Sequence, residues 1–397
     1  MDKLTIDDLD LRGKRVLMRV DFNVPLAGGK VSDDNRIRAA LPSIQKAIDD
    51  GARVVLMSHL GRPKGEVVES MRLAPVAQRL GELLGKPVTM APDCVGPEVQ
   101  AAVGELQAGD VLLLENLRFH PEEEANDPDF AAQLAALGDV YVNDAFGSCH
   151  RAHASVVGVP AHLRAAAGYL VRQEIEYLGG ALAEPRRPFV AILGGAKVSD
   201  KIGVITNLLT KVDALIIGGA MAYTFLKAKG LEVGASRVEE DRVDDARRML
   251  DGAQQRNIAF HLPSDHVVAD KFPESPDEPV EKQVTDDAAI PQGMVGLDIG
   301  PQTVRAFTAA ASEAATVVWN GPMGVFEDPR FAGGTKAVAE ALASCGATSI
   351  LGGGDTAAAV NAFGVADQVS HISTGGGASL EFLEGRELPG IAALNDK

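Results

Sequence analysis

Two glycines and two lysines follow a short apolar run at Phe189–Leu193. The run is typical of a strand buried on both faces, and the glycines at 194–195 let the backbone turn tightly beside a ligand. We expect a helix to begin near Ala196, which would put Lys197 and Lys201 on one face. Two ammonium groups at a helix N-terminus suit a polyphosphate. The alternative is an ordinary strand-to-helix turn with two solvated lysines.

Arginines, histidines and polar residues recur after the apolar runs of the N-terminal half. They are Asp21, Asn23, Arg36, His59, Arg62, Arg118, His150, Arg151 and His153. The rigid fork of arginine favours carboxylate and phosphate, so this set predicts a small ligand with several negative charges. Any one arginine taken alone is more typical of a surface ion pair, and the histidine spacing does not indicate a metal site.

Glycines take the corresponding positions in the C-terminal half. They occur in Gly194-Gly195, Gly218-Gly219, Asn320-Gly321, Gly352–Thr356 and Gly375–Gly377. Such strand ends leave room for a large ligand and free backbone N–H groups. Asp355 is placed to hold a hard cation directly or through water, with a plain helix N-cap as the alternative.

Short apolar runs alternate with longer amphipathic segments along both halves, which is typical of parallel α/β folds. The expected strands are Arg15–Val20, Val54–Ser58, Val88–Met90, Val111–Leu114 and Val140–Asn143, then Phe189–Leu193, Ala214–Ile217, Asp265–Ala269, Thr316–Trp319, Thr348–Leu351 and Val369–Ile372. We predict two Rossmann-like domains, each a parallel sheet flanked by helices, joined by a hinge helix. The N-terminal domain covers residues 1–168, the connector 169–187 and the second domain 188–387.

Composition narrows the classes of function. Lys and Arg number 38 against 55 Asp and Glu, a net charge of −17 that argues against nucleic-acid or anionic-membrane partners. No apolar stretch approaches the ~20 residues that a membrane span needs. Three widely spaced cysteines and the absence of a signal-like N-terminus lead us to expect a cytoplasmic protein without disulfides.

Several motifs resemble those of the phosphoglycerate kinase family, in family order from about residue 15 to residue 380. They are Arg19–Pro25, Ser58–Pro63, Leu114–Arg118, Gly147–His153, Leu193–Lys201, Trp319–Glu327, Gly352–Thr356 and Thr374–Gly377. Together these motifs are very specific for the family, because they are not the signature of a general fold. One departure is Ser148-Cys149, where the family usually has Thr-Ala; it puts a thiol near the arginines.

The resemblance implies Mg²⁺-dependent, reversible phosphoryl transfer between 1,3-bisphosphoglycerate with ADP and 3-phosphoglycerate with ATP, a step of glycolysis and gluconeogenesis. It implies substrate binding by Asp21, Phe22, Asn23, Arg36, His59, Leu60, Gly61, Arg62, Arg118 and Arg151. It implies nucleotide binding by Lys197, Lys201, Asn320, Glu327, Gly353, Gly354, Asp355 and Thr356, with Asp355 holding the magnesium ion. It also implies a monomer whose C-terminal tail, residues 388–397, packs back on the N-terminal domain.

The acceptor in this reaction is a carboxylate, already ionised at neutral pH, so no general base is required. We hypothesise that Lys201 and Arg36 neutralise the transferring group, helped by the N–H groups of Gly375 and Gly376. Two other functions remain open from the residues: a kinase for another carboxylate, and a non-catalytic nucleotide sensor.

Overall fold

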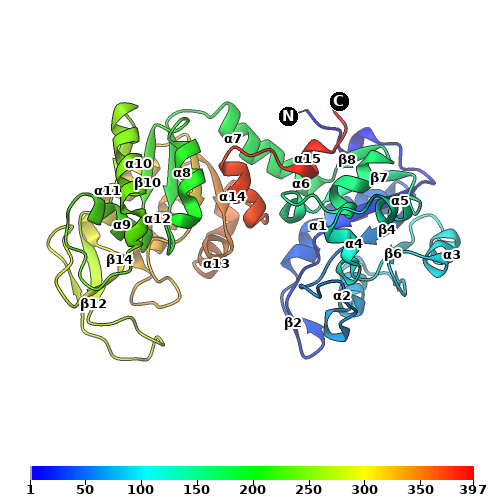
Figure 1. Cartoon of the computed structure of the whole chain (residues 1–397), viewed down its shortest axis with the longest axis horizontal. Coiled ribbons are helices and arrows are strands. Elements are labelled where there is room, and N and C mark those ends of the chain that lie inside the picture. The colour runs from blue at the N-terminus through cyan, green and yellow to red at the C-terminus, as the bar shows by residue number, and fades with distance from the viewer. Residues whose placement is uncertain (1) are drawn as a thin grey trace. The chain divides into compact units, whose positions relative to one another are not determined.

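The computed structural model describes residues 2–397 and divides into two compact units (Figure 1). The first unit comprises the chain up to Glu176 together with Glu387–Lys397, and the second is Tyr177–Arg386. Each unit contains a six-stranded sheet in which all neighbouring strands run parallel. The predicted architecture of two parallel sheets flanked by helices is confirmed.

The sheet of the first unit has the order β5-β6-β4-β1-β7-β8. Its strands are β1 (Arg15–Val20), β4 (Arg53–Met57), β5 (Val88–Met90), β6 (Val111–Leu113), β7 (Val140–Asp144) and β8 (Ala165–Ala167), and a hairpin is formed by β2 (Leu26–Ala27) and β3 (Lys30–Val31). Its helices are α1 (Asn35–Asp49), α2 (Ala74–Leu84), α3 (Pro97–Glu105), α4 (Pro121–Glu124), α5 (Pro128–Ala135), α6 (Tyr169–Glu174) and α15 (Pro389–Ala392). The central strands are apolar on both faces because helices cover both sides of the sheet.

The second unit has a sheet in the order β11-β10-β9-β15-β16-β17. Its strands are β9 (Phe189–Leu193), β10 (Ala214–Ile217), β11 (Ala259–His261), β15 (Thr316–Asn320), β16 (Thr348–Gly352) and β17 (His371–Ile372). Its helices are α7 (Gly180–Ala183), α8 (Ile202–Leu208), α9 (Met221–Ala228), α10 (Val243–Gln255), α11 (Pro301–Ser312), α12 (Gly333–Ser344), α13 (Gly354–Ala362) and α14 (Gly377–Leu383). A separate antiparallel sheet joins β12 (His266–Ala269) to β13 (Lys282–Val284) and β14 (Val295–Ile299).

Two expectations about the strands need correction. The run at Asp265–Ala269 is not part of the parallel repeat, since β12 pairs antiparallel with β13 and β14. The edge strands β8 and β11 were both missed. β8 consists of three alanines, which have little intrinsic preference for strand structure, and β11 precedes the run at Asp265–Ala269 that was expected in its place.

The segment expected to connect the domains is helical from Tyr169 to Ala183, with a π-helical stretch at Ile175–Gly179 between α6 and α7. The boundary between the two units lies inside this stretch, between Glu176 and Tyr177. Its role as a hinge stays a prediction.

The C-terminal tail packs on the first unit, where Figure 1 shows α15 close to β8. Asn395 accepts a hydrogen bond from the Leu4 N–H at 2.8 Å and donates one to the Ala165 carbonyl at 3.1 Å. The Gly390 N–H donates to the Cys149 carbonyl at 2.8 Å. Leu388, Ile391 and Leu394 are buried, so the tail contributes both backbone pairing and apolar packing to this unit.

We therefore expect Ile391→Ala to lower the free energy of unfolding of the first unit by about 2 to 5 kcal/mol, because the side chain is only 1% exposed and its removal leaves a cavity. Glu387→Gln, at an exposed position of the same segment, is the control and should change it by less than about 0.5 kcal/mol. Urea unfolding followed by circular dichroism measures both; equal midpoints for the two variants would contradict the proposed packing role.

Candidate active site

The carboxyl ends of β1, β4 and β6 bring together the polar residues expected to bind an anion. Arg36, in the first turn of α1, donates through Nη1 to both carboxylate oxygens of Asp21 at 3.1 Å and to the Asn23 carbonyl at 3.2 Å. Its Nε and Nη2 form no hydrogen bond within residues 2–397, and the side chain is 39% exposed. Asp21 thus orients the guanidinium while leaving donors free for a ligand.

The turn after β4 links these residues to Arg118. The Gly61 N–H donates to Asn23 Oδ1 at 2.9 Å, and the Gly61 carbonyl accepts from Arg118 Nη1 at 2.8 Å. Gly61 has φ +65°, and a Cβ there would lie 2.8 Å from the sulfur of Met71, so the turn requires glycine. Hydrogen bonds therefore join the ends of three strands in one network, here called the anion basin: Asp21, Asn23, Arg36, Gly61 and Arg118.

His59 is buried beside the basin and carries no charge. Arg19 Nη2 lies 3.0 Å from His59 Nδ1, and because a guanidinium only donates, Nδ1 accepts. Burial first, and then the neighbouring charges of Arg19 and Arg118, hold the pKa of His59 well below its usual range. The same causes lower the pKa of His153 to about 4. The positive charge of this region therefore comes from its arginines.

Arg19 is the residue in this region whose importance was missed. Its side chain is 1% exposed and donates through Nε to Ser155 Oγ at 2.9 Å. Ser155 in turn donates to the buried carboxylate of Glu123 at 2.5 Å. From the sequence alone, an arginine within an apolar strand is interpreted as a side chain that faces solvent. The fold shows that β1 is covered on both faces, so Arg19 is buried.

The remaining substrate candidates fall into two groups. Arg62 and Arg151 are exposed, and neither forms a hydrogen bond or ion pair within the described chain. Phe22 and Leu60 are buried, and their N–H groups donate to Ser58 Oγ and Asn116 Oδ1. Their carbonyl groups also accept hydrogen bonds, from the Val24 N–H at 2.8 Å and from Asn116 Nδ2 at 2.7 Å, so the backbone of Phe22 and Leu60 is already paired within the chain.

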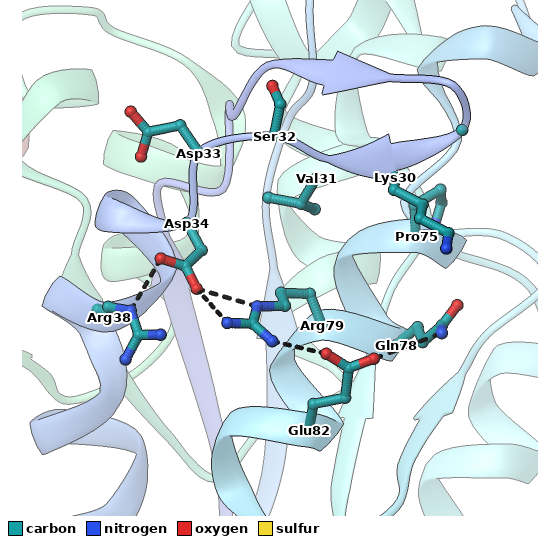
Figure 2. Close-up of a pocket in the computed structure, with 11 residues that line it drawn as sticks. Lys30, Val31, Ser32, Asp33, Asp34, Arg38, Pro75, Gln78, Arg79 and Glu82 are labelled. Carbon is teal, nitrogen blue, oxygen red and sulfur yellow. Dashed lines mark hydrogen bonds and ion pairs between the residues drawn. The ribbon is translucent and has the colours of Figure 1, made fainter.

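A hollow of about 660 Å³ lies between the β2–β3 hairpin, α1 and α2 of this unit (Figure 2). Its two arginines, Arg38 and Arg79, both point to Asp34, at 2.8 and 2.7 Å. Arg79 also pairs with Glu82. Because these charges are already neutralised, the hollow is a poor anion site, and none of the predicted site residues lines it.

In the second unit, the glycine turn after β9 differs from the expected helix start. The helix does not begin near Ala196: a 3₁₀ turn spans Ser199–Lys201 and α8 follows. The N–H groups of Val198 and Ser199 donate to the Glu239 carboxylate at 2.6 and 3.1 Å. A carboxylate of the chain therefore already caps this helix, and Lys197 precedes it as an exposed residue. The expectation that Lys197 and Lys201 share one helix face is wrong.

Lys201 is 7% exposed, and its Nζ donates to the backbone and side-chain oxygens of Asn320, the last residue of β15. Burial lowers the pKa of Lys201 to about 8. Nδ2 of Asn320 is buried without a hydrogen-bond partner, close to Gly353. A buried ammonium held only by neutral oxygens favours binding of an additional anion.

The first turn of α13 offers backbone donors to such an anion. Its N-cap is Gly353, with φ +90° and no side-chain cap. Thr356 Oγ1 accepts the Gly321 N–H at 2.7 Å. Asp355 is exposed and forms no hydrogen bond or ion pair within residues 2–397. The alternative role of Asp355 as the N-cap is therefore wrong, and the N–H groups of residues 354–356 remain open to a phosphate.

A cavity of about 360 Å³ adjoins this turn. Its lining includes Gly195, Gly219, Ala220, Tyr223, Phe272, Leu297, Val325, Glu327 and Asp355. The apolar members were missed because nothing in their spacing separates them from ordinary core residues, although the glycine pairs indicated space for a large ligand. The volume and the apolar lining suit the base and sugar of a nucleotide.

The glycine-rich turn before α14 contains the last of the catalytic candidates. Gly376 has φ +52° and is the N-cap of α14, and the Gly375 N–H lies 3.2 Å from Ser373 Oγ. Neither glycine lines the cavity.

Residues 6–386 match the phosphoglycerate kinase family. The chain belongs to this family. It is 62% identical to a phosphoglycerate kinase of Moorella thermoacetica and 58% identical to one of Chloroherpeton thalassium, each over the full length of both chains. Among solved structures, phosphoglycerate kinase from Coxiella burnetii has a TM-score of 0.90 at 43% identity, and that from Pyrococcus horikoshii has 0.84 at 34%, each covering 98% of both chains.

The thiol of Cys149, where the sequence departs from the family motif, does not lie among the arginines as expected. Cys149 is fully buried, its Sγ lies 3.5 Å from the Ala145 carbonyl, and burial raises the pKa of the thiol to about 12. Its backbone lies against Gly390 of the C-terminal tail. The thiol therefore packs beneath the tail and is not an accessible group of the anion basin.

The low pKa of Lys201 leads to a prediction about nucleotide binding. At pH 8 about half of the Lys201 side chains are neutral, and a bound polyphosphate raises this pKa, so ADP without metal should bind with uptake of up to about half a proton. Calorimetry in buffers of different ionisation enthalpy measures this uptake. Lys201→Met should abolish it, whereas Lys197→Met should retain it; equal uptake in both variants would show that another group takes the proton.

Proposed function

We propose that this member of the phosphoglycerate kinase family transfers a phosphoryl group reversibly between ATP and the carboxylate of 3-phosphoglycerate, the glycolytic reaction of its relatives. Two observations support the proposal. One unit has the anion basin with its arginines. The other has the buried Lys201, which forms no ion pair within the described residues, beside a cavity of a size that suits a nucleotide. A non-catalytic nucleotide sensor has no need of the basin.

The substrate is proposed to bind in the anion basin. Arg36 and Arg118 are held by Asp21 and the Gly61 carbonyl, and the exposed Arg62 and Arg151 supply unpaired guanidinium groups. Arginine forks match both a phosphate and a carboxylate. 3-Phosphoglycerate carries one of each, which favours it over a simple carboxylate such as acetate.

The nucleotide is proposed to bind in the second unit, with its base and ribose in the 360 Å³ cavity and its phosphates near Lys201 and the first turn of α13. Glu327, exposed at the cavity lining, is placed to accept hydrogen bonds from ribose hydroxyls. Asn320 Nδ2 and the N–H groups of Gly354 and Asp355 are the available donors. Lys197 adds an exposed cation at the rim.

Magnesium fits the residues present. Asp355 supplies an exposed, unpaired carboxylate beside the proposed phosphate site, and hard oxygen ligands are those that Mg²⁺ prefers. The ion would add positive charge against the nucleotide phosphates when bound. Asp355 would hold it together with phosphate oxygens.

No general base is needed, because the accepting carboxylate is ionised at neutral pH. The chain's task is to orient the ligands, neutralise charge and exclude water. Arg36 binds the transferring group from the substrate side and Lys201 from the nucleotide side. At the turn of Gly375 and Gly376, the Gly376 N–H is open within residues 2–397, and the Gly375 N–H would have to leave Ser373 Oγ to reach the ligand. We propose that the two units close on the segment 169–187 to bring the ligands together.

We further propose that the protein acts as a monomer in the cytoplasm. All three cysteines are free thiols, as expected in a reducing compartment. None of the helices in residues 2–397 is long and apolar enough to cross a membrane.

The assay that tests the function couples ATP consumption to 3-phosphoglycerate, acetate or aspartate. Turnover with 3-phosphoglycerate alone supports the proposal. Turnover with acetate or aspartate instead would support a kinase for another carboxylate, and nucleotide binding without any turnover would favour a sensor.

Arg36→Ala should lower kcat by about 10²- to 10³-fold, because it removes a preorganised donor to the transferring group. Arg38→Ala is the matched control: Arg38 lies on the same helix, is exposed and pairs with Asp34. Steady-state kinetics on both variants decides the assignment. Near-wild-type turnover in Arg36→Ala would remove Arg36 from the mechanism.

Arg62→Ala should mainly raise KM for 3-phosphoglycerate by about tenfold or more, since a charge-assisted hydrogen bond contributes roughly 1.5 to 3 kcal/mol. Thermal stability should not change, because Arg62 is exposed and has no partner within the described residues. An unchanged KM, measured beside Arg38→Ala, contradicts its place in the substrate site.

A further inference from the structure

Three potential metal ligands meet at the edge of the first unit, and none of them is a residue of the proposed reaction. Asp93 and Cys94 lie in the loop between β5 and α3, and His120 follows the 3₁₀ turn after β6. One ligand atom from each, the Asp93 carboxylate, the Cys94 Sγ and a ring nitrogen of His120, all lie within 4.8 Å of one another. Neither the proposed substrate site nor the nucleotide site uses any of them.

The backbone holds this cluster firmly. The Ala91 N–H donates to the Leu113 carbonyl at 2.9 Å, and the Glu115 N–H donates to the Asp93 carbonyl at 3.3 Å. These bonds continue the pairing of β5 with β6 to the loop that carries Asp93 and Cys94. The ring of His120 stacks on Phe130, with centroids 5.2 Å apart. The three side chains are therefore presented by ordered segments.

The side chains already converge without an ion. His120 Nε2 lies 2.7 Å from Asp93 Oδ1, and the same oxygen accepts the Cys94 N–H at 2.7 Å. Cys94 is fully buried, whereas the side chains of Asp93 and His120 are 46% and 27% exposed. The cluster thus has one enclosed sulfur and two ligands that solvent reaches, an arrangement that leaves a coordination position for water.

We propose that Asp93, Cys94 and His120 form a binding site for a divalent ion of the zinc class. Thiolate, imidazole and carboxylate together are ligands of Zn²⁺ and Co²⁺, whereas Mg²⁺ prefers oxygen alone. Bond lengths of about 2.0 to 2.3 Å separate tetrahedral ligands by roughly 3.3 to 3.8 Å. His120 Nε2 and Asp93 Oδ1, now 2.7 Å apart, therefore have to separate by about 0.6 Å or more to bind one ion. Atoms as far as 4.8 Å apart have to approach by about 1 to 1.5 Å.

The local charge favours a cation. Asp93 is one negative group, and Glu123 of the short helix α4, which follows His120 directly, also acts electrostatically on Cys94. Glu124 of the same helix is paired with Arg118. Binding replaces the S–H bond of Cys94 by a bond from sulfur to metal and releases the proton to solvent. Nε2 of His120 then faces the ion, with the ring proton on Nδ1.

The experiment uses the full-length protein, stripped with a chelator and titrated with Co²⁺. One equivalent should bind and give a thiolate-to-cobalt charge-transfer band in the near ultraviolet. Stoichiometric Zn²⁺ should remove the band and excess Mg²⁺ should not, which separates this site from the proposed magnesium ligand Asp355.

Cys94→Ser should abolish the band, and His120→Gln or Asp93→Asn should weaken binding at least about tenfold, since even the loss of a ligand's supporting partner costs 10- to 100-fold. Cys345→Ser, which alters a half-buried thiol of the other unit, is the control and should keep the band. Circular dichroism of the metal-free variants checks the fold; if Cys94→Ser does not fold, the two partly exposed ligands decide the outcome.

No band in the wild type, a band that survives in Cys94→Ser, or one lost in Cys345→Ser overturns the proposal. Full affinity in both His120→Gln and Asp93→Asn overturns it as well, and the Asp93–His120 contact is then an ordinary hydrogen bond that closes the loop.

Discussion

Two buried cations of this protein, Arg19 and Lys201, form no direct ion pair with a carboxylate in the part of the chain that the structure describes. Arg19 is hydrogen-bonded to Ser155 and His59, and Lys201 to the oxygens of Asn320. Burying a charge among neutral acceptors costs free energy. In a chain with a net charge of −17, many carboxylates are available to form an ion pair with a buried cation. The buried carboxylate of Glu123, which lies behind Ser155, partly offsets the charge of Arg19. Lys201 has only neutral oxygens as hydrogen-bond partners among residues 2–397.

The parallel sheet explains why these cations are buried. Arg19 is on β1 and Asn320 ends β15, and each strand is central in its own sheet. Helices cover both faces of a central strand, so polar groups there face either the core or the open end of the sheet. Short loops at that end hold the network of Arg36, Asp21 and Gly61 in place.

The sequence was enough to predict the strand ends and many of the residues on them, because buried strands read as apolar runs and the motifs follow them directly. What it did not reveal depended on contacts between distant segments. Glu239 caps the turn before Lys201 from about 40 residues away, and the pairing of β12 with β14 is not encoded in either strand alone. The burial of Arg19 and the apolar lining of the cavity were missed for the same reason.

The polar groups that remain unsatisfied are not scattered at random over the site. Asn320 Nδ2 is buried without a partner, the first turn of α13 lacks a side-chain cap, and Asp355 beside it is unpaired within the described chain. By contrast, the turn before α8 is capped by Glu239 and the arginines near α2 are paired with Asp34. At the strand ends of β15 and β16, donors and a carboxylate are therefore open together, which is an arrangement suited to a ligand that brings both phosphate and a cation. This combination of groups, rather than any single residue, is what favours the strand ends of β15 and β16 in the proposal for phosphate and a hard cation.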